Sequence, residues 1–245
     1  MCPTAHLDAR RPAPYRARPM IRVVLFDIDG TLIHTHGAGR RAFARAFADE
    51  FNLPHATDGV SFAGRTDHDI ARSIFCAHAI APVPAQFQRF YNIYLHWLQI
   101  YLADNPGEIL PGVRELLAAL AALPAPPVPA LLTGNLQRGA ELKLRSLQLW
   151  QHFTFGAYGD DVENRDAVAQ LALQHARTAL GAELAPSEIL VIGDTPRDIS
   201  CARAINARVL AVATGESTVA ELAAHAPDLV LPTLTAAHAA TLAAL

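Results

Sequence analysis

Short apolar runs alternate with helical patterns along much of this sequence, and this alternation restricts the fold more than any other feature. The runs IRVVLFDI (21–28), VPALLTG (128–134) and EILVIGD (188–194) have the length and the β-branched content of buried parallel strands. A helical pattern follows the second and third runs directly. Repeated strand–helix units predict an α/β fold, in which a doubly wound, Rossmann-like parallel sheet carries helices on both faces.

The stretch between residues 34 and 107 lacks a convincing strand and shows helical periodicity instead. Its segment GRRAFARAFADEF places Phe43, Phe47 and Phe51 four residues apart, on one face of a helix. Aromatic residues at this spacing are typical of core packing, so we expect this stretch to fold as an all-helical subdomain.

These patterns predict a division of the chain into three parts. Residues 20–33 and 108–245 are expected to form the sheet-containing core domain, and residues 34–107 the inserted helical cap domain. Residues 1–19 are rich in arginine and proline and lack an apolar stretch, so they are expected to form a flexible tail before Met20. The alternative is that translation starts at Met20 itself.

Composition and charge argue against several classes of protein. The net charge is −3, so no global positive field attracts nucleic acid, and no apolar run approaches the roughly 20 residues of a membrane span. Cys2, Cys76 and Cys201 show no CxxC spacing, which favours packed, inert thiols in a reducing compartment such as the cytoplasm. The eleven histidines show neither HExxH nor a closely paired ligand pattern, which argues against a zinc site.

Polar residues are concentrated where three of the predicted strands end. The first run ends in Asp27-Ile28-Asp29, the second in Thr133-Gly134-Asn135 and the third in Gly193-Asp194. Asp194 can be read as a helix N-cap and Thr133 as an ordinary turn residue. Two carboxylates so close together after an apolar strand repel each other and lose hydration, and a cation compensates for both effects. Because ligands of parallel sheets bind beyond the carboxyl ends of the strands, we expect the functional site there.

Three of these segments carry a family resemblance. FDIDGTL, LLTGN and VIGDTPRD resemble the first, second and fourth motifs of the haloacid dehalogenase superfamily, and they occur in the same order. The resemblance runs from about Ile21 to the C-terminus, and a DxDGT element with a downstream GDxxxD is a specific pair. The chain is most similar to the branch of phosphoglycolate phosphatases and β-phosphoglucomutases, in which a helical cap is inserted between the first two motifs.

The resemblance implies a role for each acidic residue. Asp27 is expected to attack the phosphorus and form an aspartyl-phosphate, and Asp29 to act as the general acid and base. Asp27, the backbone carbonyl of Asp29, and Asp194 are expected to hold Mg²⁺, which suits oxygen ligands. Asp198 is expected to support the ion or its waters from the next helix.

The resemblance also implies groups that bind the transferring phosphoryl. The Thr133 hydroxyl and the backbone N–H groups of Gly134 and Asn135 are expected to contact it. The third motif of the family usually contributes a lysine from a Lys-Pro pair, which the corresponding segment GDDVENRDAV lacks. Lys143, the only lysine of the chain, is therefore our predicted phosphoryl cation, and Arg165 is its competitor.

The predicted cap contributes a further candidate. FAGRTDHDI (62–70) resembles the substrate-facing loop of such caps, and it makes Arg65 the candidate ligand for an anionic group of the substrate. The alternative is a surface arginine that opens a helix. His34 and His36 lie in the expected hinge after DGT, where they can be solvated linker residues.

The predicted function is a Mg²⁺-dependent phosphatase that acts on a small phosphorylated metabolite. Within the superfamily that the chain resembles, the resemblance implies that Asp29 argues against a dehalogenase and that the absence of lysine from residues 34–107 argues against a phosphonoacetaldehyde hydrolase. A sugar-phosphate mutase shares the core residues and remains the main alternative, and a non-catalytic binding protein on the same fold is a third. The sequence leaves the oligomeric state open between monomer and dimer.

Overall fold

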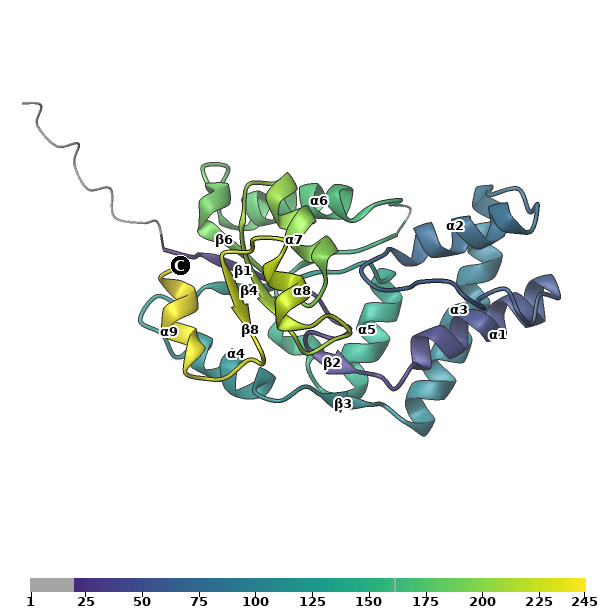
Figure 1. Cartoon of the computed structure of the whole chain (residues 1–245), viewed down its shortest axis with the longest axis horizontal. Helices are drawn as coiled ribbons and strands as arrows, with labels where there is room; N and C mark the ends of the chain where they lie inside the picture. The colour runs from purple at the N-terminus through teal and green to yellow at the C-terminus, as the bar shows by residue number, and fades with distance from the viewer. Residues whose placement is uncertain (1–19, 161) are drawn as a thin grey trace, which may run out of the picture.

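The computed structural model describes residues 20–160 and 162–245, so the expected tail lies outside the described residues. Its core is a parallel sheet of six strands in the order β5-β4-β1-β6-β7-β8 (Figure 1). The strands are β1 (Val23–Phe26), β4 (Val128–Leu132), β5 (Gly156–Ala157), β6 (Ile189–Gly193), β7 (Arg208–Val212) and β8 (Leu229–Leu231). The predicted α/β fold with a Rossmann-like sheet is confirmed.

Helices cover both faces of the sheet, because successive side chains of a strand point to opposite sides. In β1, Val24 and Phe26 pack on one side, and Val23 and Leu25 pack on the other. The first side is covered by α4 (Val113–Ala121), α5 (Gln137–Ser146) and α9 (His238–Ala243), and the second by α6 (Arg165–Leu180), α7 (Pro196–Ala204) and α8 (Val219–Ala223). Every residue of β1 and β6 is buried, as the uninterrupted apolar runs predict.

A helical unit lies beside the sheet (Figure 1). It consists of α1 (Ala38–Phe51), α2 (Asp67–Ala77) and α3 (Pro84–Asp104), and α3 packs against α5 of the core. Its interior is aromatic, with the ring of Phe43 centred 4.8 Å from that of Phe90 and 4.6 Å from that of Tyr94. Phe43 and Phe47 are buried as their spacing predicts, whereas Phe51 at the end of α1 is only partly buried.

Two short strands join the core to the helical unit. β2 (Ile33–His34) and β3 (Glu108–Ile109) are antiparallel, with Ile33 opposite Ile109 and His34 opposite Glu108. The chain leaves the core through β2 and returns through β3. We did not expect a strand at this junction, because a two-residue strand is too short to produce a periodic pattern. The short 3₁₀ segments are η1 (Trp150–His152) and η2 (Pro186–Glu188).

The described residues also bear on two expectations drawn from composition. Within residues 20–160 and 162–245, no helix has the length and apolar character needed to cross a membrane. Cys201 is buried on α7, and burial raises the pKa of its thiol to about 12, which keeps the thiol protonated and unreactive. Cys76, in contrast, is exposed near the end of α2, so the expectation that its thiol is packed is wrong.

Candidate active site

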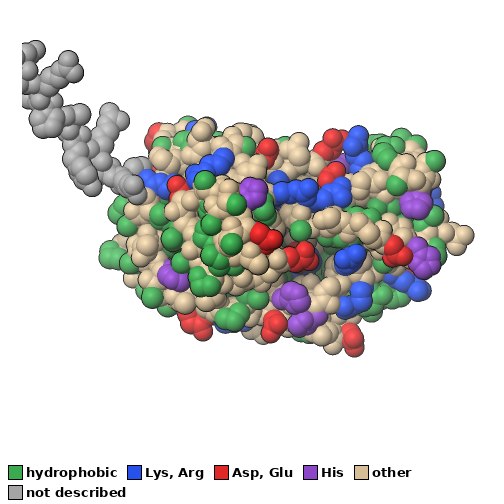
Figure 2. All heavy atoms as spheres, viewed as in Figure 1, with side chains coloured by type: hydrophobic (Ala, Val, Ile, Leu, Met, Phe, Trp, Pro, Cys, Tyr) green, Lys and Arg blue, Asp and Glu red, His purple; other side chains and the backbone are tan. Residues whose placement is uncertain are grey.

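The ends of three adjacent strands bring the predicted acidic and polar residues together. Asp27 directly follows β1, Thr133 follows β4, and Asp194 follows β6. Because β4, β1 and β6 are neighbours in the sheet, their carboxyl ends meet at one edge. Acidic and basic side chains gather over this region, where the core meets the helical unit (Figure 2). The strand-end residues therefore form one site beneath the helices of the predicted cap.

Asp27 lies in the buried half of this site, together with Arg165, Asp194 and Asp198. Its side chain is 10% exposed, and its Oδ1 accepts a hydrogen bond of 2.9 Å from Nη2 of Arg165. Burial raises the pKa of Asp27 to about 6, an effect that Arg165 opposes and the Asp198 carboxylate reinforces. The same Nη2 of Arg165 also donates to Oδ1 of Asp198. Arg165 thus joins two buried carboxylates and orients that of Asp27.

Asp27, Asp194 and Asp198 form a cluster of potential metal ligands. One carboxylate oxygen from each lies within 4.8 Å of the others, and all three residues are buried. Burial raises the pKa of Asp194 well above its usual range, and repulsion by Asp198 and Asp27 adds to the effect. Carboxylate oxygens that are buried together are the hard ligands that Mg²⁺ prefers, so the residues present fit this ion.

Two neighbouring residues, Thr31 and Thr195, fix the orientation of the Asp194 and Asp198 carboxylates. The Thr31 hydroxyl donates to Oδ1 of Asp194 at 3.0 Å. Oδ2 of Asp198 accepts from the backbone N–H of Thr195 at 3.0 Å and from its hydroxyl at 2.6 Å, within the capping box that begins α7. Because Asp198 is engaged by Arg165 and by this helix end, its contacts favour the supporting role expected from the sequence.

Asp29 lies in a different electrostatic environment. Nζ of Lys143 donates to both of its carboxylate oxygens, at 2.9 and 2.7 Å, and Nδ2 of Asn135 donates to Oδ2 at 2.8 Å. Burial opposes ionisation of Asp29, but Lys143 and Asn135 outweigh it and hold the pKa of the carboxyl below its usual range. The Asp29 side chain is 44% exposed while that of Lys143 is only 5% exposed. A buried ammonium thus faces an accessible carboxylate.

Asn135 has a role that the sequence did not predict. We expected only its backbone N–H to matter, but its side chain connects three residues. Oδ1 accepts from Nζ of Lys143 at 2.6 Å, while Nδ2 donates to Oγ1 of Thr133 at 2.8 Å and to Asp29. An amide two residues after a strand-end threonine is the only sequence signal for this bridge.

Asp67 is a second unpredicted member of the site region. It is the first residue of α2 and is buried, and its Oδ2 accepts from the backbone N–H of Leu136 at 2.9 Å and from the Tyr94 hydroxyl at 3.4 Å. Burial raises the pKa of Asp67 to about 6, although Lys143 lowers it. In sequence, Asp67 looks like an ordinary acidic residue in the first turn of a helix.

The loop before α2 (residues 62–66) packs over the site. The backbone N–H of Asp67 donates to the Gly134 carbonyl at 2.7 Å, and the Thr66 hydroxyl donates to the Val162 carbonyl at 2.7 Å. A Cβ at Gly134 would lie 2.1 Å from the Arg65 carbonyl oxygen, so only glycine permits this approach. The backbone of the predicted substrate-facing loop therefore packs on the loop that is predicted to bind the phosphoryl group.

The Arg65 side chain bonds within the helical unit. Its Nε donates to Oδ2 of Asp69 at 2.7 Å, and its Nη1 donates to the Ser61 carbonyl at 3.3 Å. Its side chain is 16% exposed. The structure thus brings the Arg65 backbone to the site but directs its guanidinium to α2, and a contact with substrate stays a prediction.

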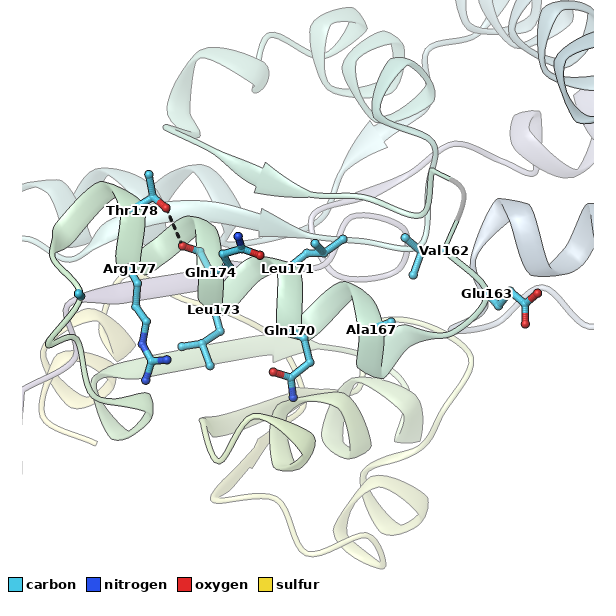
Figure 3. Close-up of a pocket in the computed structure, with 10 residues that line it drawn as sticks. Val162, Glu163, Ala167, Gln170, Leu171, Leu173, Gln174, Arg177 and Thr178 are labelled. Carbon is cyan, nitrogen blue, oxygen red and sulfur yellow. Dashed lines mark hydrogen bonds between the residues drawn. The ribbon is translucent and has the colours of Figure 1, made fainter. Parts of the chain in front are cut away.

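A large groove of about 920 Å³ lies elsewhere, along α6 (Figure 3). It is lined by Leu171, Gln174, Arg177 and Thr178 among others, and the Thr178 hydroxyl donates to the Gln174 carbonyl at 3.0 Å. These residues follow the first turn of α6, whereas Arg165 at its start faces Asp27. The groove lacks the carboxylate cluster, so its size does not make it the active site.

Comparisons with known proteins give a consistent result. The model of the haloacid dehalogenase-like hydrolases matches residues 21–206. A phosphoglycolate phosphatase of Chromobacterium violaceum is 31% identical over 214 residues, which cover 83% of this chain and 90% of that protein. A validoxylamine A 7'-phosphate phosphatase of Streptomyces hygroscopicus subsp. limoneus is 30% identical, with coverage of 88% and 95%. The crystal structure of CbbY from Rhodobacter sphaeroides in complex with phosphate matches with a TM-score of 0.64 at 21% identity, over 87% and 95% of the two chains.

Proposed function

The chain belongs to the haloacid dehalogenase-like hydrolase family, and on that premise we propose that it is a Mg²⁺-dependent phosphatase of a small phosphomonoester. One observation carries the proposal: the buried carboxylates of Asp27, Asp194 and Asp198 lie together at the strand ends. The more accessible Asp29 follows the same strand as Asp27 but contacts Lys143, so the two carboxyl groups have different surroundings and can take separate parts in one reaction.

Asp27 is the proposed nucleophile. Its carboxylate oxygen attacks the phosphorus, the bond from phosphorus to the ester oxygen breaks, and an aspartyl-phosphate remains on Asp27. Arg165 supports this step, because its hydrogen bond to Oδ1 at 2.9 Å fixes the carboxylate. Attack by water on the phosphorus then releases phosphate and restores Asp27.

Asp29 is the proposed general acid and base. It gives a proton to the departing ester oxygen in the first step, and it takes a proton from the attacking water in the second. Its side chain is 44% exposed, which leaves it accessible to a leaving group and to water. In the free protein, Lys143 holds Asp29 ionised. When substrate binds, Lys143 contacts the phosphoryl oxygens instead of Asp29, and Asp29 can then take up the proton that it delivers to the ester oxygen.

Asp27, the Asp29 backbone carbonyl and Asp194 are the proposed ligands of Mg²⁺, with Asp198 in support. The bound ion would neutralise charge on the phosphoryl oxygens as they approach the carboxylates. Its presence would also relieve the repulsion that adds to the effect of burial on the pKa of Asp194.

The remaining groups bind the phosphoryl and the substrate. The Thr133 hydroxyl and the N–H groups of Gly134 and Asn135 are the proposed phosphoryl contacts, and Lys143 is the proposed cation opposite the metal. The contact between Arg165 and Asp27 supports Arg165 as the competing cation. For Arg65 to bind an anionic substrate group, as we propose, its guanidinium must leave Asp69.

Phosphate release tests the proposed function. Phosphoglycolate, hexose and pentose phosphates, nucleotides and pyrophosphate would be incubated with the protein in Mg²⁺, and again with EDTA. We expect Mg²⁺-dependent release from at least one phosphomonoester, its loss in Asp27→Asn, and its retention in Asp166→Asn, a control at an exposed carboxylate on α6. Release that survives both EDTA and Asp27→Asn would contradict the proposal, as would transfer of the phosphoryl to a second sugar position without release.

A further inference from the structure

A second group of potential metal ligands lies at the junction between the core and the helical unit. His34, His36 and Glu108 each offer a ligand atom within 4.8 Å of the others, and all three residues are exposed. Histidine side chains gather on the surface over β2 and β3 (Figures 1 and 2). The histidine pattern of the sequence argued against a zinc site, and the set was not expected because Glu108 lies far along the chain from the two histidines.

The backbone brings these residues together from both connections. His34 in β2 is directly opposite Glu108 in β3, so their side chains lie on the same face of the two-stranded sheet. His36 has a left-handed backbone with φ of 49°, and Gly37 after it has φ of 75°. This turn folds the chain back before α1, and the His36 carbonyl accepts from Nη1 of Arg41 at 2.6 Å. His36 is thereby placed beside His34.

The spacing of the two imidazoles suits a shared metal ion. Their Nδ1 atoms are 3.1 Å apart, and their ring centres are 4.9 Å apart. Two nitrogen ligands of a tetrahedral Zn²⁺, each about 2.0–2.1 Å from the metal, lie about 3.3–3.4 Å from each other. The observed separation therefore requires only a small adjustment. Without a metal, one Nδ1–H must donate a hydrogen bond to the other Nδ1.

The chemistry of the ligands selects the type of ion. Two imidazoles with one carboxylate suit Zn²⁺ and similar transition-metal dications, whereas Mg²⁺ prefers oxygen ligands and its own water. Three protein ligands also leave a position for water, and the exposure of all three residues allows an ion to enter from solvent. This ligand set differs in kind from the carboxylate cluster of Asp27, Asp194 and Asp198.

We propose that His34, His36 and Glu108 form a binding site for Zn²⁺ or a similar transition-metal dication that links the two connections between core and helical unit. Two ligands come from the outgoing connection and one from the returning connection. A bound ion therefore joins the two connections at the junction. The proposal does not depend on the phosphatase activity.

Calorimetric titration with ZnCl₂ tests the site. All proteins would carry Asp194→Asn, to weaken the carboxylate cluster equally, and would be titrated with Mg²⁺ in excess. We expect one Zn²⁺-binding step to disappear in His34→Ala/His36→Ala and to weaken at least about 10-fold in Glu108→Gln, because each change removes ligands. His55→Ala is the matched control, since His55 is an exposed histidine whose Nδ1 lies 3.2 Å from Asp58. It should bind like the parent protein.

Three results would overturn the proposal or part of it. Equal Zn²⁺ binding by the parent and the double histidine variant excludes the site. An equal loss in His55→Ala shows that exposed histidines bind Zn²⁺ without this geometry. Loss in the histidine variant with unchanged binding in Glu108→Gln excludes the link between the two connections and leaves only a pair of histidine ligands. Because the three side chains are exposed, we expect the variants to fold, and a thermal melt of each verifies this.

Discussion

Asp27 lies beside two further buried carboxylates and the guanidinium of Arg165, whereas Asp29 lies between the ammonium of Lys143 and the amide of Asn135. Only one residue separates them in the sequence. In the Asp27 half, burial and repulsion disfavour negative charge; in the Asp29 half, hydrogen bonds to a cation and an amide favour it. The comparison shows that neighbouring carboxylates acquire distinct properties from elements far along the chain.

The difference indicates that the two halves of the site, one around Asp27 and one around Asp29, bind different groups. An excess of buried carboxylate suits a divalent cation, which is why the Asp27 half fits Mg²⁺. The Asp29 half already has its cation in Lys143. Lys143 can transfer its contact from Asp29 to the phosphoryl oxygens, which leaves Asp29 able to take up and deliver a proton. Substitutions in the two halves should therefore have different kinetic signatures.

The largest expected effect is that of Asp27→Asn. An amide is a poor nucleophile for phosphorus, so turnover should fall by at least about 10⁴-fold for every substrate, whatever its leaving group. Steady-state assays with an alkyl phosphate and with p-nitrophenyl phosphate measure the loss. A variant that retains more than a tenth of the activity on either compound would contradict the assignment of Asp27.

Asp29→Asn should have a smaller effect that depends on the leaving group. Turnover of an alkyl phosphate should fall by about 10²–10⁴-fold, since the departing alkoxide needs a proton. The first step with p-nitrophenyl phosphate should be much less affected, because p-nitrophenolate leaves without one. Equal losses in the first step for the two leaving groups would remove the distinction between the two carboxylates.

Lys143→Arg tests the cation of the Asp29 half. Lys143 is 5% exposed and Nζ contacts both oxygens of Asp29 as well as Asn135, so a larger planar guanidinium cannot reproduce these contacts. We expect kcat/KM to fall by about 10²–10³-fold, the usual range for loss of a group that stabilises transition-state charge.

Two further variants make this result specific. Arg145→Lys on the same helix is the control, because Arg145 is exposed and pairs with Glu141 at 2.7 Å. It should leave kcat/KM within about twofold, as most surface changes do. A greater loss of kcat/KM for Arg165→Lys than for Lys143→Arg would indicate that Arg165, and not Lys143, is the phosphoryl cation.

The smallest expected effect concerns stability and Asp67. Its pKa is raised from 3.8 to about 6 by burial, so folding favours its protonated form. The stability that comes from protonation is complete below pH 3.8 and is lost as the pH rises through 6. Asp67→Asn removes this dependence, so the variant should gain on the order of 1–3 kcal/mol relative to wild type between pH 4 and 7.

Thermal or denaturant unfolding at several pH values measures this gain. Asp104→Asn, at the exposed end of α3, controls for the loss of a surface carboxylate. A difference between wild type and Asp67→Asn that stays constant from pH 4 to 7 would show that the Asp67 carboxyl is not held in its neutral form.

Local patterns in the sequence predicted much of the fold and part of the site. The uninterrupted apolar runs of β1 and β6 predicted buried parallel strands, because only a sheet covered on both faces accepts such runs. Because the strands are parallel, their order along the chain already predicted that Asp27, Thr133 and Asp194 lie at the same carboxyl-end edge of the sheet. The helical period around Phe43 and Phe47 likewise predicted their burial in the helical unit.

Side-chain orientation could not be predicted, because it depends on residues distant in the chain. The motif LLTGN pointed only to the backbone N–H of Asn135, because its side-chain bridge forms only where β4, β1 and α5 meet. The guanidinium of Arg65 contacts Asp69 in the first turn of α2, although the loop that contains Arg65 resembles a substrate-binding segment. The pairing of His34 with Glu108 requires two strands of two residues each, which no periodic pattern shows.

Pre-steady-state kinetics of Asp29→Asn with p-nitrophenyl phosphate test the central claim most directly. If Asp27 is the nucleophile and Asp29 the base for the second step, the variant should form its aspartyl-phosphate and then stall. We predict a burst that approaches one p-nitrophenolate per protein molecule, followed by slow turnover. A linear time course without a burst, under conditions where wild type hydrolyses the same compound, would contradict the separate roles of Asp27 and Asp29.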